Sequence, residues 1–247
     1  NHWRFVVLVM IGSLVIFPDL GNATILILVS LLMYTISGIA YRWFTTILGL
    51  LAGVSMISLT AIRFIGVEKF SKIPVFGYVA KRFSAFFNPF NDLAGSGHQL
   101  ANSYYAMVNG GWFGLGLGNS IEKRGYLPEA HTDFVFSIVI EEFGFVGASL
   151  ILALLFFLIL RIILVGIRAR DPFNSMVAIG IGGMILIQVF VNIGGISGLI
   201  PSTGVTFPFL SQGGNSLLVL SVAIAFVLNI DASEKRAKLY RELEAQL

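Results

Sequence analysis

The sequence predicts an all-α protein that crosses a membrane several times, and three observations carry this prediction. Of its 247 residues 56% are hydrophobic and only 12% are charged, whereas about a quarter of the residues of an ordinary globular domain are charged. The mean hydropathy is +0.88. Several apolar runs approach the roughly 20 residues that an α-helix needs to cross the hydrocarbon core of a bilayer. These observations exclude a soluble globular domain.

Six apolar runs are candidate transmembrane helices. In chain order they are 5–17, 23–40, 43–62, 134–160, 176–200 and 216–230. Only Tyr41 and Arg42 separate the second run from the third, so these two helices must form an antiparallel hairpin. The loop 197–215 is uncharged and rich in Gly, Pro and hydroxyl groups. We expect it to re-enter the membrane on the outer side, where protein can bury its backbone.

The positions of Lys and Arg predict the orientation. Arg4, Arg42, the arginines of 161–170 and the basic tail fall on one side, whereas the short loops 18–22 and 197–215 carry no Lys or Arg. By the positive-inside rule the basic side is cytoplasmic. We therefore expect the chain to have four parts. In chain order they are three helices in 1–62, a large outer loop in 63–133, three helices in 134–230 and a cytoplasmic tail in 231–247.

Composition also excludes some functions. The chain has no cysteine, so it contains no disulfide, no thiolate metal site and no thiol nucleophile. Its 16 Lys and Arg exceed its 13 Asp and Glu only slightly, and they are spread over several loops. This pattern is typical of membrane orientation and not of nucleic-acid binding.

The outer loop is the most informative region, because long loops between packed elements are usually functional. Its first part, 64–90, alternates Phe with Lys and Arg, which suits a segment lying along lipid headgroups. It either anchors the loop or binds an anionic lipid through residues such as Arg82. A second part, 110–118, holds five glycines in nine residues. It could expose backbone N–H groups to a phosphate, but we favour a close-packed turn.

The end of the outer loop concentrates ionisable groups beside an apolar run. Glu129, His131 and Asp133 fall within five residues, and such clusters at a membrane are candidates for a functional site. Thr132 or Asp133 can also cap the N-terminus of the helix that follows.

Two further acids follow inside that helix. At about 100° per residue, Glu141 lies about 80° round the helix from Asp133, while Glu142 points to the far side. Both acids should face a polar cavity or a cation. Carboxylates suit hard divalent cations, but this spacing alone does not identify a metal site.

The ordered motifs resemble one family along nearly the whole chain. They are 18–21, Arg82, Asn88-Pro89, Gln99, 110–120, Lys123, 127–134, 141–144 and 208–216. This pattern is similar to that of the SEDS proteins, the FtsW and RodA polymerases of bacterial cell-wall synthesis. The resemblance implies ten helices in a complete member, so that this chain would be the C-terminal portion. The stretch 201–216 is more similar to the division branch, FtsW, than to RodA.

The resemblance implies a peptidoglycan glycosyltransferase on the outer face of the plasma membrane. Such an enzyme polymerises lipid II and releases undecaprenyl diphosphate. It implies that Asp133 is the catalytic base or orients the acceptor. Arg82 and Lys123 become candidates for diphosphate binding, with a divalent cation (Mg or Mn) as a candidate cofactor and no organic cofactor. The further substrate-binding candidates are Gln99, Glu129, His131, Glu142 and Ser211. The implied partners are a class B penicillin-binding protein and other division proteins.

Three alternatives stay open at this point. A lipid II flippase would use Asp19, Gln188, Asn192 and Asn229 to line a pathway, although interhelical hydrogen bonds explain such residues equally well. A non-catalytic scaffold of the division machinery would dock partners on 231–247. An elongation role of the RodA type would keep the chemistry and change the cellular process.

Overall fold

A computed structural model describes residues 20–37, 49, 60, 77–90 and 97–246, and within them all regular structure is helical. The expected helices 5–17 and 43–62 lie outside the described residues. The described helices are α2 (Leu20–Ile36), α5 (Gly77–Phe87), α6 (His98–Gly110), α7 (Val135–Arg168), α8 (Pro172–Ile196) and α9 (Gly214–Glu244), with a 3₁₀ turn, η1, at Glu122–Arg124.

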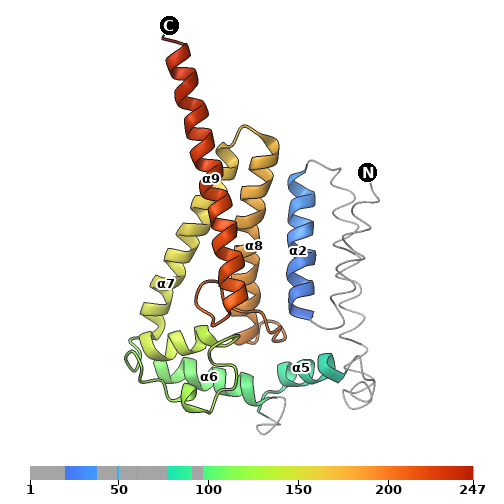
Figure 1. The fold of residues 1–247 in the computed structure, drawn as a ribbon. Coiled ribbons are helices and arrows are strands. Elements are labelled where there is room, and N and C mark those ends of the chain that lie inside the picture. The colour runs from blue at the N-terminus through green and yellow to red at the C-terminus, as the bar shows by residue number, and fades with distance from the viewer. Residues whose placement is uncertain (1–19, 38–48, 50–59, 61–76, 91–96, 247) are drawn as a thin grey trace.

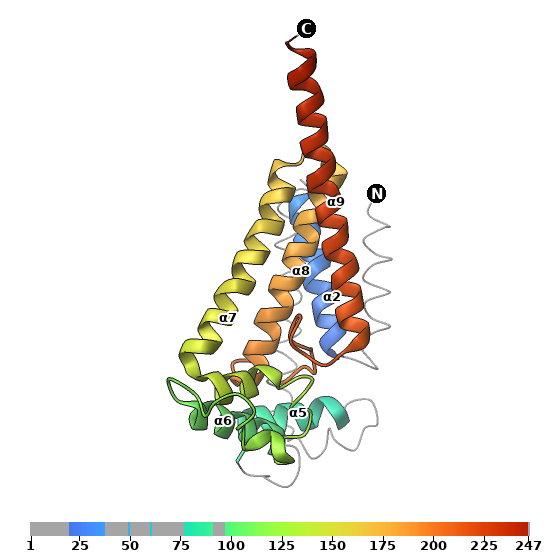
Figure 2. The same ribbon diagram turned by 60° about the vertical axis from the view of Figure 1, so that its left-hand side comes forward.

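Helices α2, α7, α8 and α9 form an elongated bundle, and α8 contacts each of the other three (Figure 1). The shorter α5 and α6 lie across one end of this bundle, drawn at the bottom of Figures 1 and 2. In the described part of the chain α7, α8 and α9 are long and apolar enough to cross a membrane. The mean hydropathy of the most apolar 18 residues is 3.1 in α7, 2.2 in α8 and 2.0 in α9. The expected fold class, an all-α polytopic membrane protein, is confirmed.

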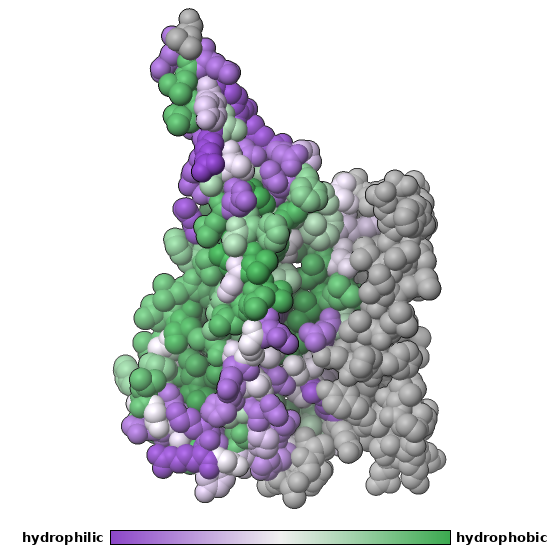
Figure 3. Space-filling model, viewed as in Figure 1, coloured by the Kyte–Doolittle hydropathy of each residue, from purple (hydrophilic) through white to green (hydrophobic). Residues whose placement is uncertain are grey.

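The surface has the polarity that a bilayer requires. Hydrophobic side chains cover the middle of the bundle, and hydrophilic ones gather at the crossing helices and along the far end of α9 (Figure 3). On α7 the exposed side chains include Leu150, Leu154 and Phe157. Exposed rows of this kind suit contact with lipid.

Local signals move the ends of two helices away from the expected runs. Helix α8 begins at Pro172, because the Asp171 carboxylate accepts a hydrogen bond of 3.0 Å from Asn174 N–H and proline fits the first helical position. Helix α9 continues to Glu244 through the charged tail. There the ion pair of Lys235 with Asp231, at 2.6 Å and one turn apart, supports a solvated helix.

Glycines let α8 approach its neighbours closely. A Cβ on Gly183 would collide with Leu32 of α2, and a Cβ on Gly182 would meet Ile163 of α7 at 2.8 Å. Small residues at membrane helix interfaces permit this kind of van der Waals packing. Because α8 is held centrally in this way, its C-terminal end is a fixed wall for the site described next.

Candidate functional site

A pocket opens at the end of the bundle that α5 and α6 cross. It is formed where α5, α6 and the residues just before α7 meet the end of α8 and the loop that follows, and the empty space there, open solvent included, is about 290 Å³. Its polar lining residues include Arg82, Gln99, Asp133, Asn192, Ser202 and Thr203. Three site residues expected from the sequence, Arg82, Gln99 and Asp133, therefore lie together although 51 positions of sequence separate the first from the last.

Asp133 lies just before α7 and not on it. The helix begins at Val135, and its capping residue is Phe134, which makes no side-chain hydrogen bond to the helix end. The expectation that Thr132 or Asp133 caps the helix is therefore wrong. Thr132 instead donates its hydroxyl hydrogen bond to the carboxylate of Glu129 at 2.6 Å.

Arg82 and Asp133 meet at one glycine. The Arg82 guanidinium donates to the carbonyl oxygen of Ser202. A Cβ on Gly204 would lie 2.9 Å from Nη2 of Arg82 and 3.3 Å from Oδ2 of Asp133. Gly204 also has a φ of +77°, which disfavours any other residue there. A guanidinium and a carboxylate thus face the same point of the pocket wall.

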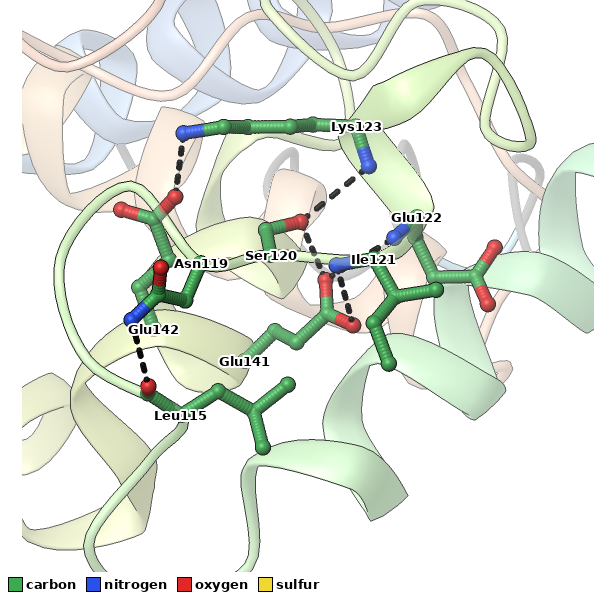
Figure 4. A network of polar contacts seen from close by, with 8 residues as sticks. All are labelled: Leu115, Asn119, Ser120, Ile121, Glu122, Lys123, Glu141 and Glu142. Atoms are coloured by element: carbon green, nitrogen blue, oxygen red, sulfur yellow. Dashed lines mark hydrogen bonds and ion pairs between the residues drawn. The ribbon is translucent and has the colours of Figure 1, made fainter.

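A second polar cluster lies away from this pocket, and Glu141 is at its centre (Figure 4). The carboxylate of Glu141 is 0% exposed. It accepts hydrogen bonds from the Ser120 hydroxyl, from Ile121 N–H at 3.2 Å, from Glu122 N–H at 3.3 Å and from Asn109 at 3.3 Å. The carboxylate therefore ties the loop 115–122 to α7.

The expectation that Glu141 shares a side with Asp133 is wrong, because it extrapolated helical geometry to a residue that lies outside the helix. Glu142 forms an ion pair with Lys123, whose side chain is 31% exposed while that of Glu142 is 8% exposed. Lys123 and Glu142, both expected to bind substrate, are thus paired with each other and do not line the pocket.

Glu122 is a strained member of this second cluster. Burial and the neighbouring Glu141 carboxylate raise the pKa of Glu122, and His98 opposes that rise. Its Oε2 is buried and has no hydrogen-bond partner among the described residues. An acceptor buried in this way costs about 1–3 kcal/mol.

The glycine-rich loop packs against a break in α7, as expected of a close-packed turn. Gly144, with φ of 70° and ψ of 179°, interrupts the helix. Cβ atoms on Gly114 or Gly144 would each collide with backbone of the other segment. The backbone groups freed by the break are paired as Leu115 N to Glu141 O, Gly116 N to Glu142 O, Phe145 N to Gly111 O and Val146 N to Trp112 O, at 2.9–3.1 Å. This satisfies the requirement that backbone near a bilayer be paired within the protein.

The remaining expected residues lie behind or beside the pocket. The side chains of Glu129 and His131 are exposed. The Ser211 hydroxyl donates to Thr132 O at 2.6 Å and accepts from Phe207 N–H at 2.7 Å. Within the described residues no group of three or more His, Asp or Glu side chains could hold a metal ion.

Asn192 is one of the pocket residues that sequence reasoning did not assign to the site. From the sequence it was expected to line a flippase pathway or to form interhelical hydrogen bonds. In the structure its side-chain amide donates hydrogen bonds to the backbone carbonyls of Asp133 and Val205. The signal that could have found it was a carboxamide near the end of an apolar helix, directly before an uncharged loop. Of the other intramembrane polar residues, Gln188 donates to Thr206 O at 3.0 Å, and Asn229 is exposed on α9.

Comparisons with known proteins agree with this architecture. The family model described as "Cell cycle protein", for the FtsW, RodA and SpoVE proteins, matches residues 2–236. The chain is 55% identical over 237 residues to a probable peptidoglycan glycosyltransferase FtsW of Lactococcus lactis, covering 96% of this chain and 56% of that protein. It is 42% identical over 230 residues to its counterpart in Enterococcus hirae, covering 92% and 57%.

A solved structure has the same fold. A chain of a peptidoglycan synthase complex, described as coordinating polymerization and crosslinking, aligns with a TM-score of 0.68 and 25% identity. The alignment covers 93% of the present chain and 60% of that chain. The chain thus spans somewhat more than half the length of the relatives that it matches.

Proposed function

Because the chain belongs to the FtsW/RodA/SpoVE family of cell cycle proteins, we propose that it carries the active site of a peptidoglycan glycosyltransferase that polymerises lipid II. The observation that carries the proposal is the meeting of Arg82 and Asp133 at Gly204, in a pocket at the end of a membrane bundle. A base and a cation at one point match the two needs of glycosyl transfer from a diphosphate.

Asp133 acts in this proposal as the general base. Its carboxylate removes the proton from the acceptor hydroxyl as that oxygen attacks C1 of the donor sugar. The new C1–O bond forms on the face opposite the departing group, and the bond from C1 to the diphosphate oxygen breaks with its electron pair. The products are a glycan longer by one unit, undecaprenyl diphosphate and a protonated Asp133.

Arg82 stabilises the negative charge that builds up on the leaving diphosphate. Its guanidinium is anchored on the Ser202 carbonyl oxygen, so it is positioned before the charge develops. A planar guanidinium also suits phosphate oxygens geometrically.

A divalent cation such as Mg²⁺ or Mn²⁺ fits this site only if the substrate supplies most of its ligands. Asp133 supplies one carboxylate, while Glu141 and Glu142 of the second cluster are engaged elsewhere. Mg²⁺ is commonly held by one or two carboxylates together with substrate phosphates. Such an ion would therefore be held by the diphosphate oxygens near the Asp133 carboxylate, and it would supply positive charge to the leaving group.

The proposal also covers the cellular location of the protein and its partner. The relatives named FtsW favour the septal wall of dividing cells over an elongation role, and the arginine and lysine distribution favours a site on the outer face of the plasma membrane. The similar chain in a peptidoglycan synthase complex supports a penicillin-binding protein of class B as partner.

The test is polymerisation of purified lipid II by the full chain together with its partner, comparing wild type with Asp133→Asn. We expect the variant to lose at least about 100-fold in rate, because an amide cannot take the hydroxyl proton, while expression and partner binding persist. Gels that resolve glycan strands report the product.

Each alternative predicts a different result. Wild-type polymer yield from Asp133→Asn would overturn the assignment of the base. Translocation of lipid II across vesicles that persists in the variant, without polymer from the wild type, would favour the flippase. Normal division of cells that carry only Asp133→Asn would favour the scaffold.

A further inference from the structure

Three consecutive backbone carbonyls of the tract that ends at Asp133 are each held from outside the tract. His131 O accepts from Gln212 N–H at 2.7 Å, Thr132 O accepts from the Ser211 hydroxyl at 2.6 Å, and Asp133 O accepts from Asn192 Nδ2 at 2.7 Å. We call this set of three hydrogen bonds the carbonyl clamp. Its donors lie on α8 and on the loop that follows α8.

The hydrogen bonds of the clamp come from other elements because no N–H group of helix α7 is bonded to these three carbonyls in the described structure. The first carbonyl that α7 uses is that of Phe134, which accepts from Ser137 N–H at 3.0 Å. The carbonyls of residues 131–133 precede it, and the donors given above for all three lie outside α7. The position of the Asp133 backbone is thus set by tertiary hydrogen bonds and not by the helix.

Asn192 is the member of the clamp that contacts Asp133 directly. Its side chain is 3% exposed, and its Nδ2 donates both to Asp133 O and to Val205 O, each at 2.7 Å. Both N–H bonds of a planar amide are then used, which fixes the side chain in one orientation. It joins Asp133 to the loop that contributes Gly204 and Ser202 to the pocket wall.

Stability alone does not explain this amide. Asn192 Oδ1 is buried and has no hydrogen-bond partner among the described residues. Such an acceptor costs about 1–3 kcal/mol, which offsets most of what two ordinary hydrogen bonds contribute. An amide that gains little stability but holds the backbone of Asp133 points to a role in geometry.

We propose that Asn192 and Ser211 are positioning residues that hold Asp133 through the carbonyl clamp and thereby set the rate of the chemical step. The proposal rests on the function proposed above, with Asp133 as the base. A displacement of about 1 Å at a reacting group can lower a rate about 100-fold. Loss of a clamp donor should therefore lower kcat and leave KM nearly unchanged.

Asn192→Leu and Ser211→Ala, made in the full chain, test this with matched controls. Gln188→Leu is the control for Asn192, because Gln188 lies one turn earlier on α8 and binds the same loop at Thr206 O, at 3.0 Å, without touching the clamp. Ser216→Ala is the control for Ser211, because Ser216 bonds only locally, to Gly213 O at 2.9 Å. Ser211→Thr keeps the hydroxyl and serves as the rescue variant.

We expect Asn192→Leu and Ser211→Ala to lower kcat about 10- to 100-fold with KM within about 2-fold of wild type. Ser211→Thr should recover most of the rate, and both controls should stay within about 2-fold. An equal loss of kcat in Gln188→Leu and Asn192→Leu would overturn the proposal, since it would mean general loosening of the loop. A loss of kcat that is proportional to the loss of folded protein would also overturn the proposal, and so would a rise in KM at unchanged kcat.

A second readout does not depend on catalysis. These 247 residues contain no cysteine, so Asp133→Cys introduces the one thiol of this part of the protein, and its alkylation rate by a maleimide reports its local position. The clamp predicts that adding Asn192→Leu changes this rate, while adding Gln188→Leu does not. If wild type polymerises no lipid II, the proposed function fails, yet this comparison still tests the clamp. Equal rates in both double variants would refute the clamp itself.

Discussion

Two polar clusters lie at the same end of this molecule, and only one of them is open. The pocket cluster joins Arg82 and Asp133 around Gly204. The closed cluster is centred on Glu141, Glu142 and Lys123, and the carboxylates of Glu141 and Glu142 accept from loop N–H groups, the Ser120 hydroxyl and one ammonium (Figure 4). Both contain acids beside a membrane helix, so residue type does not separate a reactive site from a structural one. What separates them is that Asp133 lines a pocket, whereas Glu141 is 0% exposed and does not line that pocket.

Of the substitutions that test this distinction between the two clusters, Glu141→Ala should have the largest effect, which is on stability. Removing the carboxylate leaves Ile121 N–H and Glu122 N–H without their acceptor in a buried site, and we expect a loss of about 3 kcal/mol. The melting temperature in detergent should fall by about 6–12 °C, while the activity per folded molecule stays close to wild type.

Arg82→Gln, from the pocket cluster, should show the opposite pattern. Its melting temperature should stay within about 2 °C of wild type, and its kcat/KM should fall about 100-fold because the leaving diphosphate loses a positive charge. If Glu141→Ala melts like wild type but makes no polymer, the closed cluster belongs to the active site and the distinction fails.

Lys123→Met should lower stability by an intermediate amount. It distinguishes a structural role of this lysine from a role in binding the diphosphate. The substitution leaves the Glu142 carboxylate, which is 8% exposed, without its cation, and we expect a loss of about 1–2 kcal/mol. The double variant Lys123→Met/Glu142→Gln should regain most of that stability, since no unpaired charge remains. Melting curves of both variants measure this. A raised KM for lipid II that the double variant does not correct would show that Lys123 binds the diphosphate.

The smallest effect is expected from Glu122→Gln and depends on pH. Because the pKa of Glu122 is raised above its ordinary value of 4.5, the folded state favours the protonated carboxyl, so stability falls as pH rises from 4.5 through the folded-state pKa. The neutral amide lacks this penalty. At pH 7–8 the variant should therefore melt above wild type, by about 1 kcal/mol or less.

The difference should vanish as the pH falls well below 4.5, where Glu122 is protonated in both the folded and the unfolded state. Glu129→Gln, at an exposed position, is the control, and its melting curve should follow wild type at each pH. An advantage of Glu122→Gln that grows as the pH falls would show that the sign is wrong.

The sequence was sufficient for the fold class because that class follows from composition. Long apolar runs and the scarcity of charge leave few options for α7, α8 and α9, whatever their detailed packing. The ends of α8 were less predictable, since Asp171 and Pro172 form a cap that hydropathy does not register. The continuation of α9 through its charged tail is supported by exposed ion pairs one turn apart.

The site was predictable as a list of residue types but not as a geometry. Asp133 was singled out by its position at the end of the outer loop, and a family resemblance supported it. That Glu141 turns to the loop 115–122 depends on the start of α7 at Val135 and on long-range hydrogen bonds that no periodicity encodes. The role of Asn192 was harder to predict, because its partners are backbone carbonyls, which every residue has.

The carbonyl clamp has a consequence for the order in which this protein is made. Its donors come late in the chain, since Asn192 follows Asp133 by 59 positions and Ser211 follows Thr132 by 79. At about 5–20 residues per second, a ribosome needs roughly 4–16 s to add 79 residues. When Asp133 has just been synthesised, none of the donors that will hold its tract exists yet. The clamp therefore cannot form on a nascent chain before residues 192–212 have been made, so this part of the site is assembled only after most of α8 and its following loop exist.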